Sequence, residues 1–417
     1  NSAQDMPFLL SHTPSMVVTS DAGSGIGYTG MRIRGSDATR INVNINGVPL
    51  NDSESHGVFW VNLPDFASST QSMQLQRGVG SSTNGAGAFG ASLSLSTNGI
   101  AENAVGDLGF SGGSFNTLKA NLQFGSGIIK GKGKWNSEFS GRISTIQSDG
   151  YIDRASSNLR SVYLSASIFS ENTLIKAIAF GGHEITYQAW YGIDQETLDS
   201  NRKYNPAGEI YDDNGVLTGY YDNQVDDYKQ DHYQLHINHD FGNDWTGNLA
   251  FHYTYGRGFY EQYENDAEFS IYGFEPINVD GEEVNSTDLV QRKWLDNDFY
   301  GTTFSLLKNF DNVNVIFGGG LNQYDGDHFG EVKWAKYGSN MVDERFYDNT
   351  GKKTDFNVYA KADHAINDQW SLFGDVQYRY VNYEVEGIDE GPVEIGLKDK
   401  NNFFNPKMGL SYFPVSY

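Results

Sequence analysis

Hydrophobic and polar residues alternate with a period of two along most of the chain after residue 100. In the segment DHYQLHINHDF, residues 231–241, the tyrosine, leucine, isoleucine and phenylalanine share one parity, and most of the polar residues share the other. Residues 161–168, 248–255 and 355–363 repeat the pattern. Because successive side chains of a β-strand point to opposite faces, the pattern predicts strands with one apolar and one polar face.

The lengths of the connections decide which kind of sheet these strands form. We count about a dozen strands after residue 100, each of roughly 10 to 18 residues, joined by alternately short and long connections. The short connections are 171–172, 242–244, 311–312 and 367–368, and the long ones are 188–228, 264–291, 325–353 and 387–402. A soluble β-sandwich also shows alternation, but long connections on one side only are typical of an outer-membrane barrel. The sequence therefore predicts an antiparallel transmembrane β-barrel.

Composition supports an all-β fold and excludes several classes of partner. The 417 residues include 48 Gly, 26 Tyr, 26 Phe and only 9 Pro, which suits many strands joined by turns. No apolar run approaches the roughly 20 residues of a membrane-spanning helix. The net charge of −24 disfavours nucleic acid as a partner, and the absence of Cys excludes disulfides and thiolate metal sites.

A glycine motif at Gly85, Gly87 and Gly90 has the G-x-G-x-x-G spacing of dinucleotide-binding proteins. That motif binds a pyrophosphate only where the glycines open a helix. Here Leu93 and Leu95 alternate with serines, which predicts a strand. We therefore expect these glycines to allow tight turns and close backbone packing.

The first hundred residues differ from the rest, since their segments are short, rich in Gly, Ser and Asn, and weakly amphipathic. They contain MRIRGSDATRINVNINGVPLNDSESHGVFWVNLPDF and MQLQRGVGSSTNGAGAFGASLSLST. These stretches resemble the plug domain of the TonB-dependent outer-membrane receptors. Residues 31–35 look like the R-I-R-G strand of that family, 41–49 like its N-G-V-P hairpin, and 76–90 like the segment before its barrel. Two departures are Val79 in place of the usual Pro, and FGAS in place of the common G-G-x-I run.

The resemblance implies a plug domain at residues 1–100 folded inside a barrel that begins at residue 101 and continues to residue 417. Family barrels have about 22 strands, so the dozen strands here imply that further strands follow this chain. The family's TonB box, which joins TonB by strand addition, would precede Asn1. We therefore expect the chain to be incomplete at both ends.

The resemblance also implies active import and no enzymatic activity. The expected partners are the TonB-ExbB-ExbD complex, outer-membrane lipid and lipopolysaccharide, and a surface lipoprotein in some branches. The plug sequence looks more like the siderophore-receptor branch, which implies a ferric siderophore or a similar iron chelate as the ligand. Haem, cobalamin, glycan or peptide carried by the same machinery is the alternative. A secreted all-β carbohydrate-binding protein or glycosidase is a more remote alternative. The long loops are expected to be extracellular, and no resident cofactor is implied.

Family resemblance places the ligand site on two apical loops of the plug, residues 36–40 and 51–60. Polar groups lie beside aromatic rings in the second loop, a mixture that suits a rigid, partly apolar chelate. The candidate binding residues are Arg40, Asp52, Glu54, His56, Phe59 and Trp60. Alternatively, Phe59 and Trp60 pack the plug against the barrel wall. Arg34 and Arg77 lie in motifs whose arginines pair with barrel carboxylates in the family, which implies a plug latch.

Other clusters of reactive residues carry weaker signals. Residues 53–56 hold the residue types of a hydrolase triad, but adjacent residues cannot converge as a triad requires. His232, His236 and His252 share the polar parity, which lumen-facing polar residues explain more simply than a metal site. The acidic segment 211–228 lacks the spacing of a calcium loop. No catalytic or metal site is therefore predicted.

Overall fold

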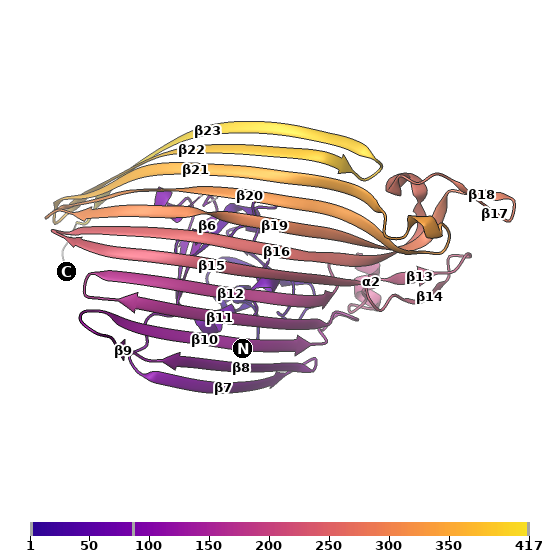
Figure 1. Ribbon diagram of the computed structural model, residues 1–417, viewed down its shortest axis with the longest axis horizontal. Helices are drawn as coiled ribbons and strands as arrows, with labels where there is room; N and C mark the ends of the chain where they lie inside the picture. Colours follow the sequence, from indigo (N-terminus) through magenta and orange to yellow (C-terminus); the bar gives the residue numbers. More distant parts are fainter. Residues whose placement is uncertain (1–2, 86–87, 415–417) are drawn as a thin grey trace.

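A single antiparallel sheet dominates the structure, a computed structural model that describes residues 3–85 and 88–414. We call this sheet the wall; its strands run side by side across Figure 1. In order, it consists of β7 (Ala104–Gly113), β8 (Thr117–Ser126), β10 (Asn136–Ser148), β11 (Ser157–Phe169), β12 (Thr173–Tyr187), β15 (Val225–Gly242), β16 (Trp245–Glu268), β19 (Ser286–Asn309), β20 (Val313–Ala335), β21 (Arg345–Asn367), β22 (Trp370–Asp389) and β23 (Val393–Tyr412). The short strand β9 (Ile129–Lys130) pairs with β10. The predicted dozen antiparallel strands are confirmed, and β7 and β23 end the order among the described residues.

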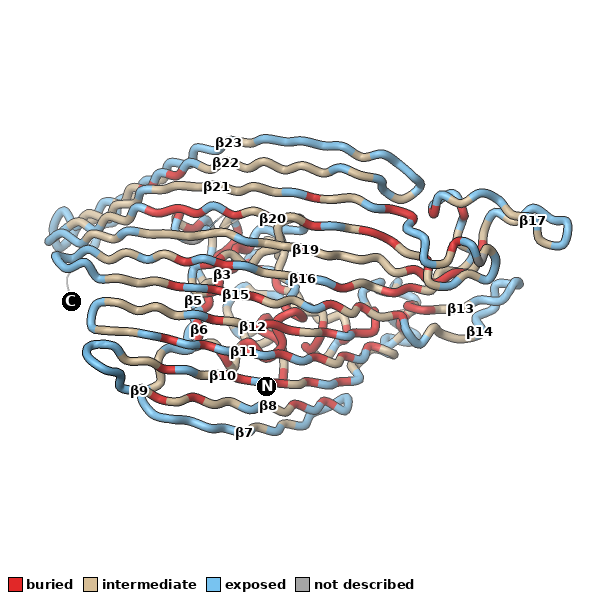
Figure 2. Tube along the Cα trace, viewed as in Figure 1, coloured by how far each residue is buried: buried red, intermediate tan, exposed pale blue. Residues whose placement is uncertain are grey.

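The two faces of the wall follow the alternation in the sequence. On β11, Leu164 and Ile168 are 46% and 53% exposed, whereas Ser165 and Ser167 between them are buried. Apolar side chains on the exposed face are those expected to meet lipid. The opposite face covers the N-terminal region, where buried residues concentrate in Figure 2. None of the helices among the described residues is long and apolar enough to cross a bilayer.

Several strands are longer than predicted, so two of the long connections are shorter. Strands β16 and β19 have 24 residues each. The predicted connection 325–353 is largely strand, because β20 continues to Ala335 and β21 begins at Arg345. The predicted connection 387–402 is a tight hairpin between β22 and β23. Toward the ends of these strands, hydrophobic and polar residues no longer alternate, but the backbones of neighbouring strands remain paired. The hydrophobic pattern therefore could not predict how far the strands extend.

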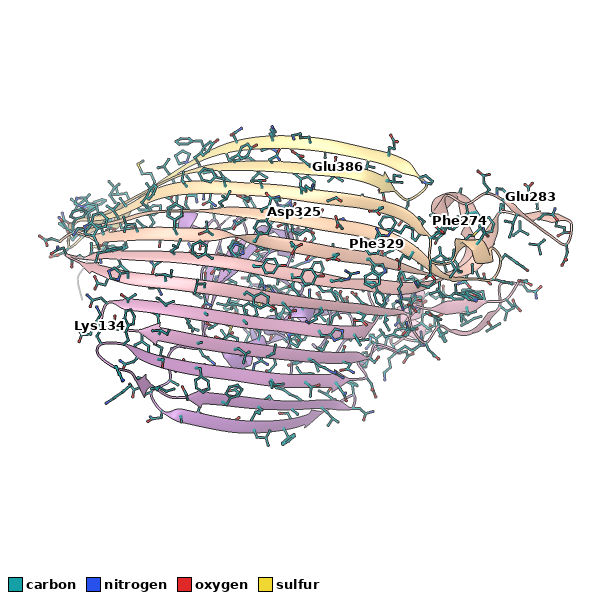
Figure 3. The ribbon with its side chains drawn as sticks, in the orientation of Figure 1. Lys134, Phe274, Glu283, Asp325, Phe329 and Glu386 are labelled. Carbon is teal, nitrogen blue, oxygen red and sulfur yellow. The ribbon has the colours of Figure 1, made fainter. Side chains whose placement is uncertain are left out.

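The remaining long connections lie at one end of the wall, which we call the long-connection end. They carry α2 (Gln195–Ser200), β13 (Glu209–Tyr211), β14 (Leu217–Tyr220), η5 (Phe269–Tyr272), β17 (Ile277–Val279), β18 (Glu282–Val284) and η6 (Ser339–Met341). Phe274 and Glu283 mark a part that projects beyond the strands, whereas Lys134 lies toward the opposite, short-turn end (Figure 3). The predicted alternation of short and long connections is therefore confirmed from β11 to β20, but it is wrong for the connection between β22 and β23, which is as short as those at the opposite end.

The N-terminal region forms smaller elements behind the wall in Figure 1. Strands β4, β3, β6 and β5 make a four-stranded sheet in that order, with β3 and β6 parallel, and β1 pairs with β2. The elements are α1 (Met6–Leu9), β1 (Met16–Ser20), β2 (Thr29–Ile33), η1 (Ala38–Arg40), β3 (Ile41–Ile45), β4 (Val48–Pro49), η2 (Trp60–Asn62), η3 (Phe66–Ser69), β5 (Thr70–Arg77), η4 (Ser82–Asn84) and β6 (Ala91–Thr97). Asn46 and Gly47 join β3 to β4 with φ of 55° and 83°, the positive angles of a type I′ hairpin turn.

The glycine-rich segment leads into strand β6, as predicted, and not into the helix that a dinucleotide site requires. Gly85 has a φ of +94°, and a Cβ at Gly90 would collide with the side chain of Ser36. Gly87 lies outside the described residues. The two described glycines thus permit a left-handed backbone and a close approach between segments.

An apolar core attaches the N-terminal region to the wall. Trp60 and Phe66 pack in one cluster with Phe180 of β12, and the ring centroids of Phe66 and Phe180 are 5.1 Å apart. A Cβ at Gly182 would collide with the backbone of Asn62, so this wall position permits the close approach.

A buried ion cluster provides the second attachment. The Asp65 carboxylate pairs with Lys119 of β8 and, at 3.2 Å, with Arg142 of β10. The Arg142 Nε also donates to Ser69 Oγ at 2.8 Å. The three charged side chains are at most 4% exposed. Such charges are tolerated only while they remain paired, so Asp65 fixes the position of the N-terminal region on the wall.

We expect Asp65→Ala to weaken this attachment by about 3 kcal/mol, because two buried cations lose their carboxylate. The measurement is the urea concentration at which a protease begins to cleave the N-terminal region of the membrane-inserted full-length protein. Asp37→Ala, which removes a half-buried plug carboxylate that caps η1 and forms no ion pair with the described part of the wall, is the matched control. Equal urea midpoints for the two variants would contradict the anchoring role.

Candidate functional site

Two cavities lie between the N-terminal region and the wall. The first, of about 640 Å³, is closer to the long-connection end, and we call it the aromatic cavity. The second, of about 740 Å³, is closer to the short-turn end, and we call it the amide cavity. Pro49, Asn51, Asp52, Ser53 and Phe299 contribute to the lining of both. The cavities are therefore neighbours, separated by the start of the loop at residues 51–60, which we call the apical loop.

Ten aromatic residues line the aromatic cavity: Tyr28, Phe59, Trp190, Tyr228, Phe259, Tyr260, Trp294, Phe299, Tyr324 and Tyr347. Four of them form a continuous series of edge contacts. Tyr28 lies 6.5 Å from Phe59 and 5.5 Å from Trp190, and Trp190 lies 6.1 Å from Tyr260, as measured between ring centroids. The series joins the N-terminal region, a long connection and strand β16. It gives the cavity a rigid apolar surface with phenol groups at its edge.

Tyr28 also contacts two wall carboxylates. Its hydroxyl lies 3.3 Å from Glu184 Oε1 and within hydrogen-bond distance of Asp226 Oδ2. Burial, followed by the neighbouring carboxylates, raises the pKa of the Tyr28 phenol well above its ordinary value. The phenol therefore stays protonated and donates to an acidic pair, which fixes the ring at the edge of the aromatic cavity.

The amide cavity has a different chemistry, since its lining is rich in amides and charged groups. Seven asparagines line it: Asn42, Asn46, Asn51, Asn238, Asn248, Asn322 and Asn357. The charged lining residues are Lys176, Asp52, Lys353, Asp355 and Arg379. The Arg379 Nε donates to both oxygens of Asp355, at 3.0 and 3.2 Å.

The apical loop owes its shape to an internal carboxylate cap. Asp52 Oδ1 accepts from the backbone N–H of Glu54 at 3.0 Å and of Ser55 at 2.6 Å. The Asn51 side chain donates to the backbone oxygens of Ile41 and His56 at 2.9 and 2.8 Å. These local bonds stabilise the turn without help from the wall.

Glu54 ties the apical loop to the wall. Its carboxylate accepts from the hydroxyls of Tyr324, at 2.7 Å, and Tyr383, at 3.0 Å, and lies 3.0 Å from His328 Nε2. Burial alone would raise the pKa of the Glu54 carboxyl, but the hydrogen bonds and the charge of His328 outweigh it and lower the pKa. A Cβ at Gly351 would collide with the carboxylate. Three wall strands thus accommodate one side chain of the apical loop.

The structure distributes the predicted binding residues over distinct environments. Phe59 is 45% exposed and lines the aromatic cavity, whereas His56 lines the amide cavity. Burial, followed by the charge of Lys353, lowers the pKa of the His56 imidazole, so this ring is neutral at neutral pH. Trp60 is 3% exposed and belongs to the apolar core, as the packing alternative states. Arg40 is exposed and lines neither cavity.

The two arginines of the expected latch lie on the surface of the N-terminal region. Arg34 is exposed in a turn with a φ of 50°, and Arg77 donates to the backbone oxygen of Pro14 at 3.3 Å. Among the described residues neither forms an ion pair with a carboxylate. The buried attachment found here has the opposite polarity, with the carboxylate of Asp65 in the N-terminal region and the cations on the wall.

Sequence patterns did not single out the wall residues of the site. Tyr324 and Glu54 are 270 positions apart, and alternation predicts the face of a side chain but not its partner. Trp190 could have been predicted from the sequence, because it is next to Tyr191 at the start of the long connection that follows strand β12. Aromatic residues in that position are candidates for a ligand site.

The three inward-facing histidines have ordinary polar partners. His236 Nε2 lies 2.9 Å from Gln234 Oε1, and His252 Nε2 lies 2.8 Å from Asn322 Oδ1. His232 is bonded to Thr254. Within residues 3–85 and 88–414 there is no group of three or more His, Asp or Glu side chains arranged to hold a metal ion.

A sheet whose exposed face is apolar, with an N-terminal region packed against its opposite face, has the architecture of a plugged membrane barrel. The chain belongs to the TonB-dependent receptors, since the family model of the TonB dependent receptor-like β-barrel matches residues 176–416. The model of the TonB-dependent receptor plug domain matches residues 1–92. Members of this family are outer-membrane β-barrels with a plug, and the family is one of receptors and transporters. From here on, the N-terminal region is called the plug. No curated protein matches the sequence significantly.

Solved structures of this family share the fold at low identity. The ferric yersiniabactin uptake receptor from Yersinia pestis matches with a TM-score of 0.65 and 12% identity, over 98% of this chain and 59% of that chain. The ferric-catecholate import receptor from E. coli K12 matches with a TM-score of 0.68 and 14% identity, over 99% of this chain and 65% of that chain. A copper transporter matches with a TM-score of 0.68 and 13% identity, over 98% of this chain and 57% of that chain. The chain spans less than two thirds of each of these proteins.

We expect the contact between Glu54 and the wall to depend on pH. The pKa of Glu54 in the folded protein lies below the ordinary 4.5, so the contact is stabilising above that value and is lost as the pH falls through the lower value. These 417 residues contain no Cys, so within them a spin label on Cys introduced at the exposed Ser55 reports the apical loop alone. Its mobility should rise between about pH 5 and about pH 3.

Glu54→Gln should show the high mobility already at neutral pH, whereas Glu102→Gln, which alters an exposed carboxylate, should titrate like the unmodified protein. A label that is equally immobile in the Glu54→Gln variant at neutral pH would refute the contact.

Proposed function

We propose that this protein imports an iron chelate, such as a ferric siderophore, across the outer membrane with energy from the TonB-ExbB-ExbD complex. The observation that carries the proposal is the aromatic cavity between the apical loop and the wall. Its volume of about 640 Å³ lies in the range of small-molecule sites. Family membership supplies the mode of transport, and the cavity supplies a place for the ligand.

The chemistry of the aromatic cavity favours a rigid, partly apolar ligand with polar edges. Ring faces and edges contact apolar and aromatic groups well, and the neighbouring Tyr28 and His328 side chains offer polar contacts at the margin. A chelate with aromatic or aliphatic arms around a polar metal centre has both kinds of surface. Phe59 contributes the most exposed ring that the apical loop presents to this space.

We propose a plug at residues 1–100 and barrel wall at 101–417, with the long-connection end facing the exterior. The aromatic cavity lies toward that end, where an external ligand arrives first. Lipid and lipopolysaccharide would cover the apolar outer face of the wall, and a surface lipoprotein would have to contact the long connections.

Haem, cobalamin, glycan and peptide are alternative cargoes for the same machinery. Membership of an outer-membrane family does not fit the secreted carbohydrate-binding protein. An uptake assay with each class of cargo separates the remaining alternatives.

We expect cells expressing the full-length receptor to accumulate radiolabelled iron from a ferric chelate only when TonB is active. Ferric citrate, a ferric tris-catecholate and ferrioxamine B are the probes. Phe59→Ala should lower the affinity of surface binding about tenfold, since it removes a ring from the cavity. The matched control is Phe89→Ala, because Phe89 is an exposed plug ring that lines neither cavity.

Failure of every iron probe, together with uptake of haem, cobalamin, glycan or peptide, would overturn the assignment of the cargo. Equal affinities of the Phe59→Ala and Phe89→Ala variants would overturn the assignment of the cavity.

A further inference from the structure

The amide cavity carries a local excess of positive charge in a strongly acidic protein. Three cations and two carboxylates line it, although the whole chain has a net charge of −24. One carboxylate, Asp355, is engaged by Arg379. The other, Asp52, directs an oxygen to the backbone of its own loop. Among the described residues, neither carboxylate forms an ion pair with either of the two lysines of the lining.

The two lysines are held by neutral oxygens. Lys353 Nζ donates to the backbone oxygen of Ser53 at 2.6 Å, and Lys176 Nζ donates to that of Asn98 at 2.6 Å. Within the described part of the chain, neither ammonium has a carboxylate at ion-pair distance. An ammonium has three N–H donors, so each lysine keeps at least one donor for an anion.

The remaining lining supplies hydrogen bonds without charge. Each asparagine amide both donates and accepts, and such groups suit a ligand with many oxygen atoms. The neutral imidazole of His56 adds a further polar group without adding positive charge. The lysines therefore decide the charge preference of this cavity, and the amides decide its preference for oxygen.

We propose that the amide cavity is a second binding site for the transported chelate, selective for anionic, oxygen-rich ligands through Lys353 and Lys176. This inference rests on the proposed function. The two cavities share the Asn51–Ser53 segment, so a ligand that passes from the aromatic cavity toward the short-turn end reaches the amide cavity next. Lys353 also holds the Ser53 carbonyl, so an anion that competes for this ammonium loosens the segment between the cavities.

The test compares surface binding and uptake of anionic and cationic chelates in cells with the full-length receptor. Ferric citrate and a ferric tris-catecholate are the anionic probes, and ferrioxamine B is the cationic probe. Lys353→Gln should reduce the uptake of an anionic probe at least fivefold and leave its surface affinity within twofold. Lys353→Arg should restore uptake, because it keeps the charge. Lys176→Gln, which alters a lysine bonded to Asn98 and not to the apical loop, should show the same selectivity.

Lys352→Gln is the matched control, because Lys352 is the exposed neighbour on the same strand and lines neither cavity. A purely structural role of Lys353 would reduce the uptake of anionic and cationic probes equally, which would overturn the inference. Import of ferrioxamine B alone, or unchanged anionic uptake in both glutamine variants, would also overturn it while leaving iron import intact. Absence of uptake for every iron probe would instead overturn the proposed function on which the inference rests.

Discussion

The inward face of the wall carries the polar half of every alternating strand, and those groups need partners inside the molecule. Hydrogen-bonding and charged groups that are removed from water are stable only when they are paired. The plug supplies some of these partners. Asp65 pairs with two buried cations of the wall, and Glu54 accepts from two tyrosine hydroxyls. Other inward groups, such as Asn322 and Asn357, line one of the two cavities, so the polar inner face also borders the space proposed for a ligand.

The apical loop connects this packing to the proposed transport. Its carboxylate cap makes the turn rigid, and Glu54 fixes the turn to the wall. Phe59 then contributes to one cavity and His56 to the other. Residues that line the two cavities and residues that contact the wall therefore lie within the same ten-residue loop. A ligand that moves the loop must exchange contacts with the wall, and a contact that is lost at the wall changes the shape of both cavities.

Sequence patterns predicted the architecture more completely than the site. Alternation identified the wall strands and their two faces, and Asn46-Gly47 marked the hairpin of the plug. The outer parts of the long strands were missed, because pairing continues beyond Asp325 without an apolar face to mark it. The apical loop was located from its motif, but partners such as Lys119 for Asp65 lie 54 positions away on a different element. A strand pattern determines which face a side chain joins, whereas the partner depends on the register between plug and wall.

The proposed binding of an iron chelate in the aromatic cavity is tested most directly by a crystal structure of the full-length receptor with a transported ferric chelate, recorded at the iron absorption edge. We predict an anomalous difference peak for iron inside the aromatic cavity, between Phe59 of the apical loop and the Trp190 ring. A peak located outside both cavities, with the Phe59 ring free of ligand, would contradict it.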